Sequence, residues 1–194
     1  MQTVYRGVRF LKNPFDIGLY LQLLSRLKPK TVIEICCRFG GSALWFADMM
    51  RCHGIEHPHV IALDIAPEVD FADPRIMVIQ GDAAALGNSL PDTLLATLPR
   101  PWLVVEDSSH FYHHSMATLE FFHNRLDVGD YIVVEDGIVE HLSGENYRQY
   151  QNGPNRAVAD FLAKEGTHYS VDTELCDFYG TNATYNPNGW LRRK

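Results

Sequence analysis

Residues 31–52, TVIEICCRFGGSALWFADMMRC, decide the fold. Thr31–Ile35 is a short apolar run rich in β-branched residues, which is typical of a buried strand. Gly40-Gly41-Ser42 then opens a helix that we expect to reach about Cys52, with Ser42 as its N-cap. A buried strand that turns directly into a helix indicates alternating β and α structure.

The same alternation extends in both directions from this stretch. It predicts further strands at His59–Ile65, Ile76–Gln80, Trp102–Glu106, Tyr131–Glu135, Tyr169–Cys176 and Ala183–Leu191, and helical segments at Pro14–Leu27, Leu90–Leu98, His114–Arg125 and Pro154 to about Lys164. Strands joined by helices pair in parallel with right-handed crossovers. We therefore predict a Rossmann-like α/β fold with a mostly parallel seven-stranded sheet, helices on both faces and an antiparallel C-terminal hairpin.

This fold is expected to form a single domain over residues 1–194. Residues 1–28 are interpreted as an N-terminal helical segment. The polar stretch 137–153, which contains several turn formers, is interpreted as a substrate lid.

Composition and charge narrow the function classes. The net charge of −7 argues against non-specific binding to nucleic acid. No apolar stretch approaches about eighteen residues and no signal-peptide pattern opens the chain, so we expect no membrane span and a cytoplasmic location. The cysteines at 36, 37, 52 and 176 form no CxxC pair, which favours reduced thiols over a zinc site.

Acidic residues follow the ends of all five predicted parallel strands. They are Glu34, Asp64, Asp82, Asp107 and the pair Glu135-Asp136. A single such acid is often only a helix N-cap. Because ligands of open α/β sheets bind at the carboxyl ends of the strands, the whole set favours a ligand site.

The first strand and the second strand suggest a nucleoside ligand. Gly40-Gly41 lets the backbone approach a ligand, but it belongs to neither a GxGxxG nor a GK[ST] motif. An acid such as Asp64, at the end of the second strand, commonly accepts hydrogen bonds from ribose hydroxyls. S-adenosylmethionine is a nucleoside without a pyrophosphate and fits this pattern. The alternative for the two glycines is a tight turn without a ligand.

Asp107, Glu135 and Asp136 should lie on neighbouring strands. A like-charge pair about 4 Å apart costs about 4 kcal/mol at an effective dielectric constant near 20. Either one carboxyl stays protonated, or a cation lies between them. Ligands that are all oxygen favour Mg²⁺, and a bound divalent ion can orient a substrate hydroxyl and lower its pKa.

His110 follows Asp107 by three residues, which puts it beside this predicted metal site. An imidazole there is suited to take a proton from a hydroxyl. Two alternatives remain open. His110 can simply cap the next helix, or Asp107, His110 and His114 can bind a softer metal, which would leave Glu135-Asp136 without a task.

Five segments carry a family resemblance: VIEICCRFGGSALWFADMM (32–50), VVEDSSHFYHH (104–114), GDYIVVEDGIVE (129–140), NGPNRAVADFL (152–162) and NPNGWLRR (186–193). Together they resemble the cephalosporin hydroxylase and rhamnosyl O-methyltransferase family over nearly the whole chain. The resemblance implies a class I S-adenosylmethionine-dependent methyltransferase fold. It also implies similarity to macrolide-sugar and catechol O-methyltransferases, which use Mg²⁺.

The resemblance implies roles for individual residues. Asp107, Glu135 and Asp136 would hold Mg²⁺, with Asp107 also bordering the cofactor, and His110 would be the general base. Asp64 would hold the cofactor ribose, Glu34 with Gly40, Gly41 and Ser42 the methionine part, and Gly81 with Asp82 the adenine. One position departs from the family pattern: Cys36 stands where a glycine is usual, and its side chain would crowd the methionine.

These observations lead to one hypothesis and two rivals. We expect a homo-oligomeric enzyme that transfers a methyl group from S-adenosylmethionine, with Mg²⁺, to a hydroxyl of a small-molecule sugar or glycosylated natural product. One rival is a metal-dependent hydrolase or lyase that uses the same acids and His110. The other, favoured by Cys36 alone, is a cofactor-binding partner of an oxygenase that has no activity of its own.

Overall fold

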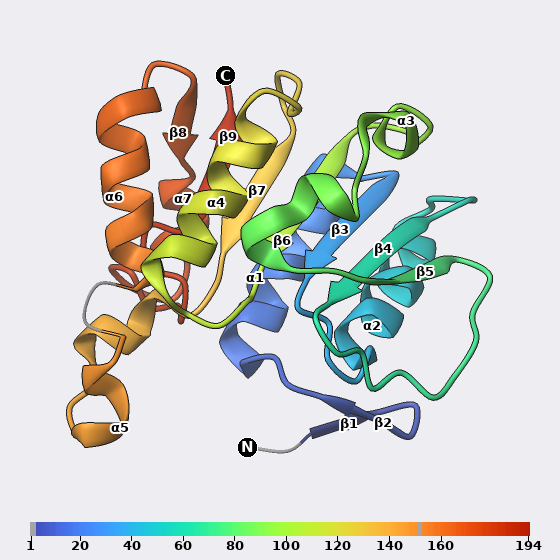
Figure 1. Cartoon of the computed structure of the whole chain (residues 1–194), viewed down its shortest axis with the longest axis horizontal. Helices are drawn as coiled ribbons and strands as arrows, with labels where there is room; N and C mark the ends of the chain where they lie inside the picture. Colours follow the sequence, from blue (N-terminus) through green and yellow to red (C-terminus); the bar gives the residue numbers. More distant parts are fainter. Residues whose placement is uncertain (1–2, 151–152) are drawn as a thin grey trace.

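A seven-stranded sheet runs through the computed structural model, which describes residues 3–150 and 153–194 (Figure 1). The strand order is β5-β4-β3-β6-β7-β9-β8. Their bounds are β3 Thr31–Ile35, β4 His59–Asp64, β5 Ile76–Gln80, β6 Trp102–Glu106, β7 Tyr131–Val134, β8 Tyr169–Val171 and β9 Trp190–Arg193. Strands β3 to β7 pair in parallel, and β9 is antiparallel to both of its neighbours. The predicted fold class is thus confirmed.

The chain leaves β3 in one direction along the sheet and returns on its other side with β6. This reversal makes the carboxyl ends of β3 and β6 the expected position of a ligand crevice. In Figure 1 these ends face the lower edge of the molecule, where the strands β1 and β2 also lie.

Helices cover both faces of the sheet. Apolar side chains of α1 (Pro14–Leu27), α2 (Gly41–Cys52) and α7 (Thr173–Cys176) form a core on one face. Those of η1 (Ala83–Asn88), α3 (Asp92–Leu95), α4 (Tyr112–His123) and α6 (Pro154–Glu165) form a core on the other. Neighbouring strand residues such as Val32 and Ile33 point into opposite cores, because side chains alternate along a strand.

Local sequence signals account for several element bounds. Helix α1 spans the predicted residues: the Asn13 side chain accepts a hydrogen bond from the Phe15 N–H at 2.7 Å, and Pro14 occupies the first turn. The bounds of β3, β5 and β6 also match the prediction. The N-cap of α2, however, is Gly40 with φ 77°, and Ser42 lies inside the helix, so the prediction of Ser42 as cap was wrong.

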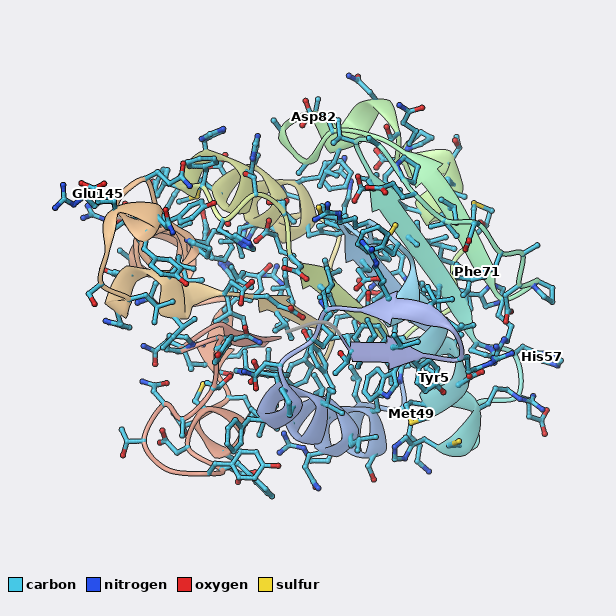
Figure 2. All side chains as sticks on the ribbon, turned by 90° about the horizontal axis from the view of Figure 1, so that it is seen from below. Tyr5, Met49, His57, Phe71, Asp82 and Glu145 are labelled. Atoms are coloured by element: carbon cyan, nitrogen blue, oxygen red, sulfur yellow. The ribbon has the colours of Figure 1, made fainter. Side chains whose placement is uncertain are left out.

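The N-terminal segment is not helical throughout, which corrects the prediction for residues 1–28. Residues 1–2 lie outside the described part. Strands β1 (Thr3–Tyr5) and β2 (Val8–Phe10) form a hairpin. Its two turn residues, Arg6 and Gly7, both have positive φ, as tight hairpin turns require. The hairpin packs on α2, and Figure 2 shows Tyr5 beside Met49.

The C-terminal strands are shorter than predicted. The strand predicted at Tyr169–Cys176 ends at Val171, because the Asp172 side chain accepts from the Leu175 N–H at 3.1 Å and starts α7. Of the strand predicted at Ala183–Leu191, residues before Trp190 form turns. The antiparallel pairing of the last two strands is confirmed, although α7 and turns connect them.

Two short helices lie in the predicted lid, residues 137–153, of which 151–152 are outside the described part. They are η2 (Gly137–His141) and α5 (Glu145–Arg148). The side chains of α5 are not buried, and Glu145 projects from the rim of the molecule in Figure 2.

Two other helices differ in length or start from the prediction. The helical segment predicted at Leu90–Leu98 is reduced to α3, because Pro91 fixes its start. Helix α4 begins two residues earlier than predicted.

All four cysteines are free thiols, as predicted. Among the described helices, none is both long and apolar enough to cross a bilayer.

Candidate active site

The strand ladder brings the predicted acids together. The Asp107 N–H donates to the Ile35 carbonyl at 3.1 Å, and the Glu135 N–H donates to the Glu106 carbonyl at 2.8 Å. The parallel pairing therefore continues one residue beyond β6 and β7. Asp107 and Glu135 consequently leave the sheet side by side, with Glu34 on the adjoining strand β3.

Asp107, His110 and Asp136 form the candidate metal centre. Their ligand atoms lie within 4.8 Å of one another, and His110 Nε2 is 3.6 Å from Asp136 Oδ2. Glu135 is directed elsewhere: Oε1 accepts from the Tyr20 hydroxyl and Oε2 from Lys12 Nζ at 2.8 Å. Two of the three predicted acids, Asp107 and Asp136, thus lie together with His110. The third, Glu135, is hydrogen-bonded to Lys12 and Tyr20 instead.

Lys12 is the central cation of this site, and the sequence analysis missed it. Its ammonium lies 2.7 Å from Asp107 Oδ2, 2.8 Å from Glu135 Oε2 and 3.5 Å from Glu34 Oε1. Its side chain is 3% exposed. From the repulsion between neighbouring carboxylates we expected either a protonated carboxyl or a cation between them. Between Asp107 and Glu135 there is such a cation, the ammonium group of Lys12.

Lys12 lies two residues before α1, and two polar residues of that helix lie close to the same site. Asp16 and Tyr20 follow it at four-residue intervals, which puts them on one side of α1. Tyr20 donates to Glu135, and the buried Asp16 accepts from the Thr184 hydroxyl at 2.5 Å and the Tyr185 N–H at 3.2 Å. The i, i+4 spacing of Asp16 and Tyr20 indicates that α1 borders a polar site, but Lys12 precedes the helix, so this periodicity does not identify it.

The centre carries more negative than positive charge. Four carboxylates, those of Glu34, Asp107, Glu135 and Asp136, surround the single ammonium of Lys12. Burial raises the pKa of Asp107 to about 6, that of Asp136 to about 7 and that of Glu135 to about 8. A group whose charged form is so unfavourable can either bind protons or be neutralised by a divalent cation. Oxygen ligands with one nearby imidazole fit Mg²⁺ and related ions.

Three residues of the site have left-handed backbone conformations. The φ angles of Cys36, His110 and Asp136 are 75°, 62° and 57°. Such conformations cost about 1 to 3 kcal/mol for residues with a side chain and cluster at functional sites. The positive φ at Cys36 is a backbone conformation that a glycine would adopt without strain.

His110 has the properties of a proton acceptor. Its Nδ1 is buried and has no hydrogen-bond partner within the described structure. Burial lowers the pKa of His110 below its ordinary value of 6.5, so that the ring is neutral at pH 7. The ring of Tyr150, from the lid segment, packs edge-on against it with centroids 5.7 Å apart.

Two adjoining cavities open at the carboxyl ends of the strands. The first, about 210 Å³, is bordered among others by Lys12, Ser42, Asp107, His110 and Asp136. The second, about 110 Å³, is bordered among others by Asp64, Gly81, Asp82, Ser109 and His114. Cys36 and Ser108 line both cavities and therefore lie at their junction. Asp64, Gly81 and Asp82, predicted for the nucleoside, thus line one cavity. Asp107, Asp136 and His110, predicted for metal and base, line the other, whereas Glu135 lines neither.

Asp64 and Glu34 differ in how their carboxylates are satisfied. The two Asp64 oxygens accept from the N–H groups of Arg38 and Ala66, both at 2.8 Å, which fixes the turn after β3. Glu34 is fully buried, and neither oxygen has a hydrogen-bond donor among the described residues. Its charge is instead met by Lys12, whose ammonium lies 3.5 Å from Oε1.

The predicted glycines and Asp82 also have structural roles. A Cβ atom on Gly41 would lie 2.0 Å from the Arg9 carbonyl oxygen, so Gly41 admits the N-terminal hairpin. A Cβ on Gly81 would lie 2.4 Å from the Ser89 hydroxyl. The Asp82 side chain accepts from the Ala84 N–H at 2.8 Å and caps η1.

The whole chain matches a known protein family and individual members of it. Residues 1–194 match the family described as "Rhamnosyl O-methyltransferase/CmcI". The chain is 30% identical to the rhamnosyl O-methyltransferase of Mycobacterium tuberculosis strain H37Rv, over 99% of this chain and 78% of that protein. It is 31% identical to the rhamnosyl O-methyltransferase of Mycobacterium leprae strain TN, over 99% and 83%.

Solved structures share the fold. A structure of CmcI with Mg and SAM has a TM-score of 0.75 at 24% identity, covering 99% of this chain and 76% of that one. The MycE methyltransferase in complex with Mg, SAH and mycinamycin VI has a TM-score of 0.53 at 20% identity, covering 78% and 43%. These similarities indicate the methyltransferase fold.

Proposed function

Because the chain belongs to the rhamnosyl O-methyltransferase/CmcI family, we propose that it transfers the methyl group of S-adenosylmethionine, with Mg²⁺, to a hydroxyl of a sugar or glycosylated natural product. The observation that carries the proposal is the convergence of Asp107, His110 and Asp136 beside the two joined cavities. It supports a metal and a base next to a second cavity that the residues predicted for the nucleoside border.

The metal would be held by the acids after β6 and β7. Asp107 and Asp136 face His110, and Glu135 adds its charge from beside Lys12. When bound, Mg²⁺ would orient the acceptor hydroxyl and lower its pKa. The surplus of carboxylates over Lys12 supports this assignment, since a divalent cation would offset it.

The cofactor would extend across both cavities. Asp64, Gly81 and Asp82 border the space proposed for the adenosine, and Ser42 borders that for the methionine. Glu34 is fully buried beside Lys12 and borders neither cavity, so it would influence the cofactor through its charge. Cys36, at the junction of the cavities, would lie against the middle of the cofactor.

His110 would take the proton of the acceptor hydroxyl. Its lowered pKa keeps the ring neutral at pH 7, which a base requires. The resulting oxygen nucleophile would attack the methyl carbon of the sulfonium in line, and S-adenosylhomocysteine would leave. Most of the acceleration would come from orienting the two reactants and stabilising the developing alkoxide.

A sugar ring is the acceptor that the surroundings favour. Phe111 and Tyr150 lie beside His110, with their ring centroids 5.3 Å apart. Aromatic faces combined with nearby polar groups suit a ring that has both C–H faces and hydroxyls. The named sugar specificity of the mycobacterial relatives points in the same direction.

Calorimetry with S-adenosylhomocysteine tests the cofactor assignment. We expect binding to the wild-type protein, and weaker binding to Asp64→Asn, which removes the carboxylate that faces the proposed ribose. Glu68→Gln, at an exposed position of the same loop, should bind like the wild type. Absence of binding, or metal-dependent turnover of esters or other substrates without the cofactor, would contradict the proposal.

A further inference from the structure

A second cluster of metal-binding side chains lies at the opposite edge of the sheet from the active site. It consists of His123 at the end of α4, Glu165 at the end of α6 and His168 just before β8. Their ligand atoms all lie within 4.8 Å of one another. In Figure 1 the ends of α4 and α6 lie near β8, away from the β1–β2 hairpin.

The distances in this cluster suit a metal ion better than hydrogen bonds. His123 Nε2 and His168 Nδ1 are each 3.4 Å from the same oxygen, Glu165 Oε2. N–H···O hydrogen bonds are usually about 2.7 to 3.2 Å long. Two ligands that are each about 2.1 Å from a tetrahedral zinc ion lie about 3.4 Å apart. Both contacts therefore have the length of an edge of a zinc tetrahedron.

We propose that His123, Glu165 and His168 bind a zinc ion, with water as the fourth ligand. Two imidazoles and one carboxylate are a common zinc donor set. The site shares no residue with the acidic centre, so the proposal does not depend on the proposed function.

The ligands are held in place before an ion arrives. The His123 ring packs against Phe161 and Tyr169, with centroids 5.9 Å away in both cases. The Glu165-x-x-His168 turn is closed by the His168 N–H, which donates to the Glu165 carbonyl at 2.9 Å. Lys194 then fixes the turn from outside, because its N–H donates to the His168 carbonyl at 2.8 Å.

The cluster is both accessible and suitably charged. The His168 side chain is 51% exposed, so a metal ion can reach the cluster from its side. The side chains of His123 and Glu165 are 17% and 20% exposed. Lys164 is nearby but is paired with Glu120 at 3.5 Å. The Arg193 guanidinium lies over the Tyr169 ring, 5.1 Å from its centroid.

A zinc ion here would tie together two helices whose other ends reach the active site. Helix α4 starts at Tyr112, two residues after His110. Helix α6 starts at Pro154, directly after Gly153, where an added Cβ would lie 2.8 Å from the His110 carbonyl oxygen. The ion would therefore fix the relative position of the segment with the base and the end of the lid.

Zinc calorimetry on the full chain tests the proposal. The protein is first stripped with a chelator and then saturated with Mg²⁺ and S-adenosylhomocysteine, so that ligands occupy the acidic centre. We expect one equivalent of zinc to bind, and His168→Ala and Glu165→Gln to weaken its affinity by at least about tenfold. The matched control is His57→Ala: His57 is exposed and projects from the opposite rim of the molecule in Figure 2.

Cobalt substitution supplies an independent readout. Tetrahedral Co²⁺ should give visible absorption in the wild type and in Asp136→Asn, but not in His168→Ala. Retained folding of each variant is checked by circular dichroism, and His168→Asn replaces any variant that unfolds. Absence of zinc binding to the wild type would overturn the proposal. So would zinc binding that persists in His168→Ala and Glu165→Gln but is lost in Asp136→Asn.

Discussion

At the scale of single residues, Lys12 determines how the acidic centre is held together. One ammonium group contacts carboxylates that follow β6 and β7 and lies close to a third on β3. Removing one partner of a buried ion pair typically costs about 3 to 5 kcal/mol, because the other charge stays buried and uncompensated. The stability of the sheet edge therefore depends on a residue from outside the sheet.

We expect Lys12→Met to lower the free energy of unfolding by about 3 kcal/mol or more at pH 7. Urea denaturation followed by circular dichroism measures the change. Lys30→Met is the matched control, because Lys30 is exposed and its loss should change stability little. Equal urea midpoints for the two variants would show that Lys12 does not stabilise the buried carboxylates.

His110 allows a prediction for catalysis. His110→Gln should reduce methyl transfer by about 10² to 10⁴ fold and leave the affinity for S-adenosylhomocysteine unchanged, since only proton removal is lost. At saturating Mg²⁺, which keeps the metal-binding carboxylates deprotonated, the wild-type rate should fall only below the ordinary histidine pKa of 6.5, because the pKa of His110 is lowered and protonation inactivates a base. Steady-state kinetics across pH measures both effects.

The control is His113→Gln, at the exposed histidine three residues further along. It should keep the wild-type rate. A full rate in His110→Gln would remove this residue from the reaction.

At the scale of elements, the N-terminal hairpin acts as a cover over the start of α2. The Arg9 carbonyl occupies the space in which a side chain at position 41 would lie. Arg9 and Leu11 also border the larger cavity, so the hairpin closes one side of the site. Gly41 is therefore required by packing between elements as well as by the turn in which it lies.

Gly41→Ala should displace the hairpin and destabilise the protein by about 1 to 3 kcal/mol, the usual cost of overpacking. Thermal denaturation gives the stability, and limited proteolysis reports release of the hairpin. Gly87→Ala is the matched control, because its added Cβ would meet nothing nearer than 3.9 Å. Equal protease resistance of the two variants would contradict the packing argument.

At the scale of the whole molecule, the surplus of buried carboxylates links stability to pH and to cations. The pKa values of Asp107, Asp136 and Glu135 are raised to about 6, 7 and 8. Between the ordinary carboxyl pKa and these values, the folded state binds more protons than the unfolded state. Stability must then fall as pH rises, by about 1.4 kcal/mol per pH unit for each such proton.

The metal-free protein should therefore lose thermal stability between about pH 5 and pH 8. Mg²⁺ should reverse much of this loss at the upper end, because it binds the deprotonated carboxylates. Melting curves with a chelator and with Mg²⁺ measure both trends, and Asp136→Asn should respond less to the ion. Stability that rises with pH in the chelated protein would contradict the charge assignment.

The order of residues along the chain was enough to predict the alternation of strands and helices and the edge of the sheet at which the acids gather. Apolar periodicity is a local property, and right-handed parallel crossovers leave little freedom in how such elements assemble. The positions of Asp107, His110 and Asp136 at one end of the sheet follow from these two facts. The predicted ends of elements that are set by caps, such as those of α2, α3 and β8, were less accurate. A single side chain or one residue with positive φ is enough to shift such an end.

Which side chains contact one another became known from the three-dimensional packing. Lys12 lies 95 residues from Asp107 and 123 from Glu135 in the chain, so no local pattern could pair them. The turn of Glu135 toward Lys12 and Tyr20, the reason for Gly41 and the His123–Glu165–His168 cluster have the same origin. Each depends on how distant segments pack, and packing selects side-chain directions that periodicity leaves undetermined.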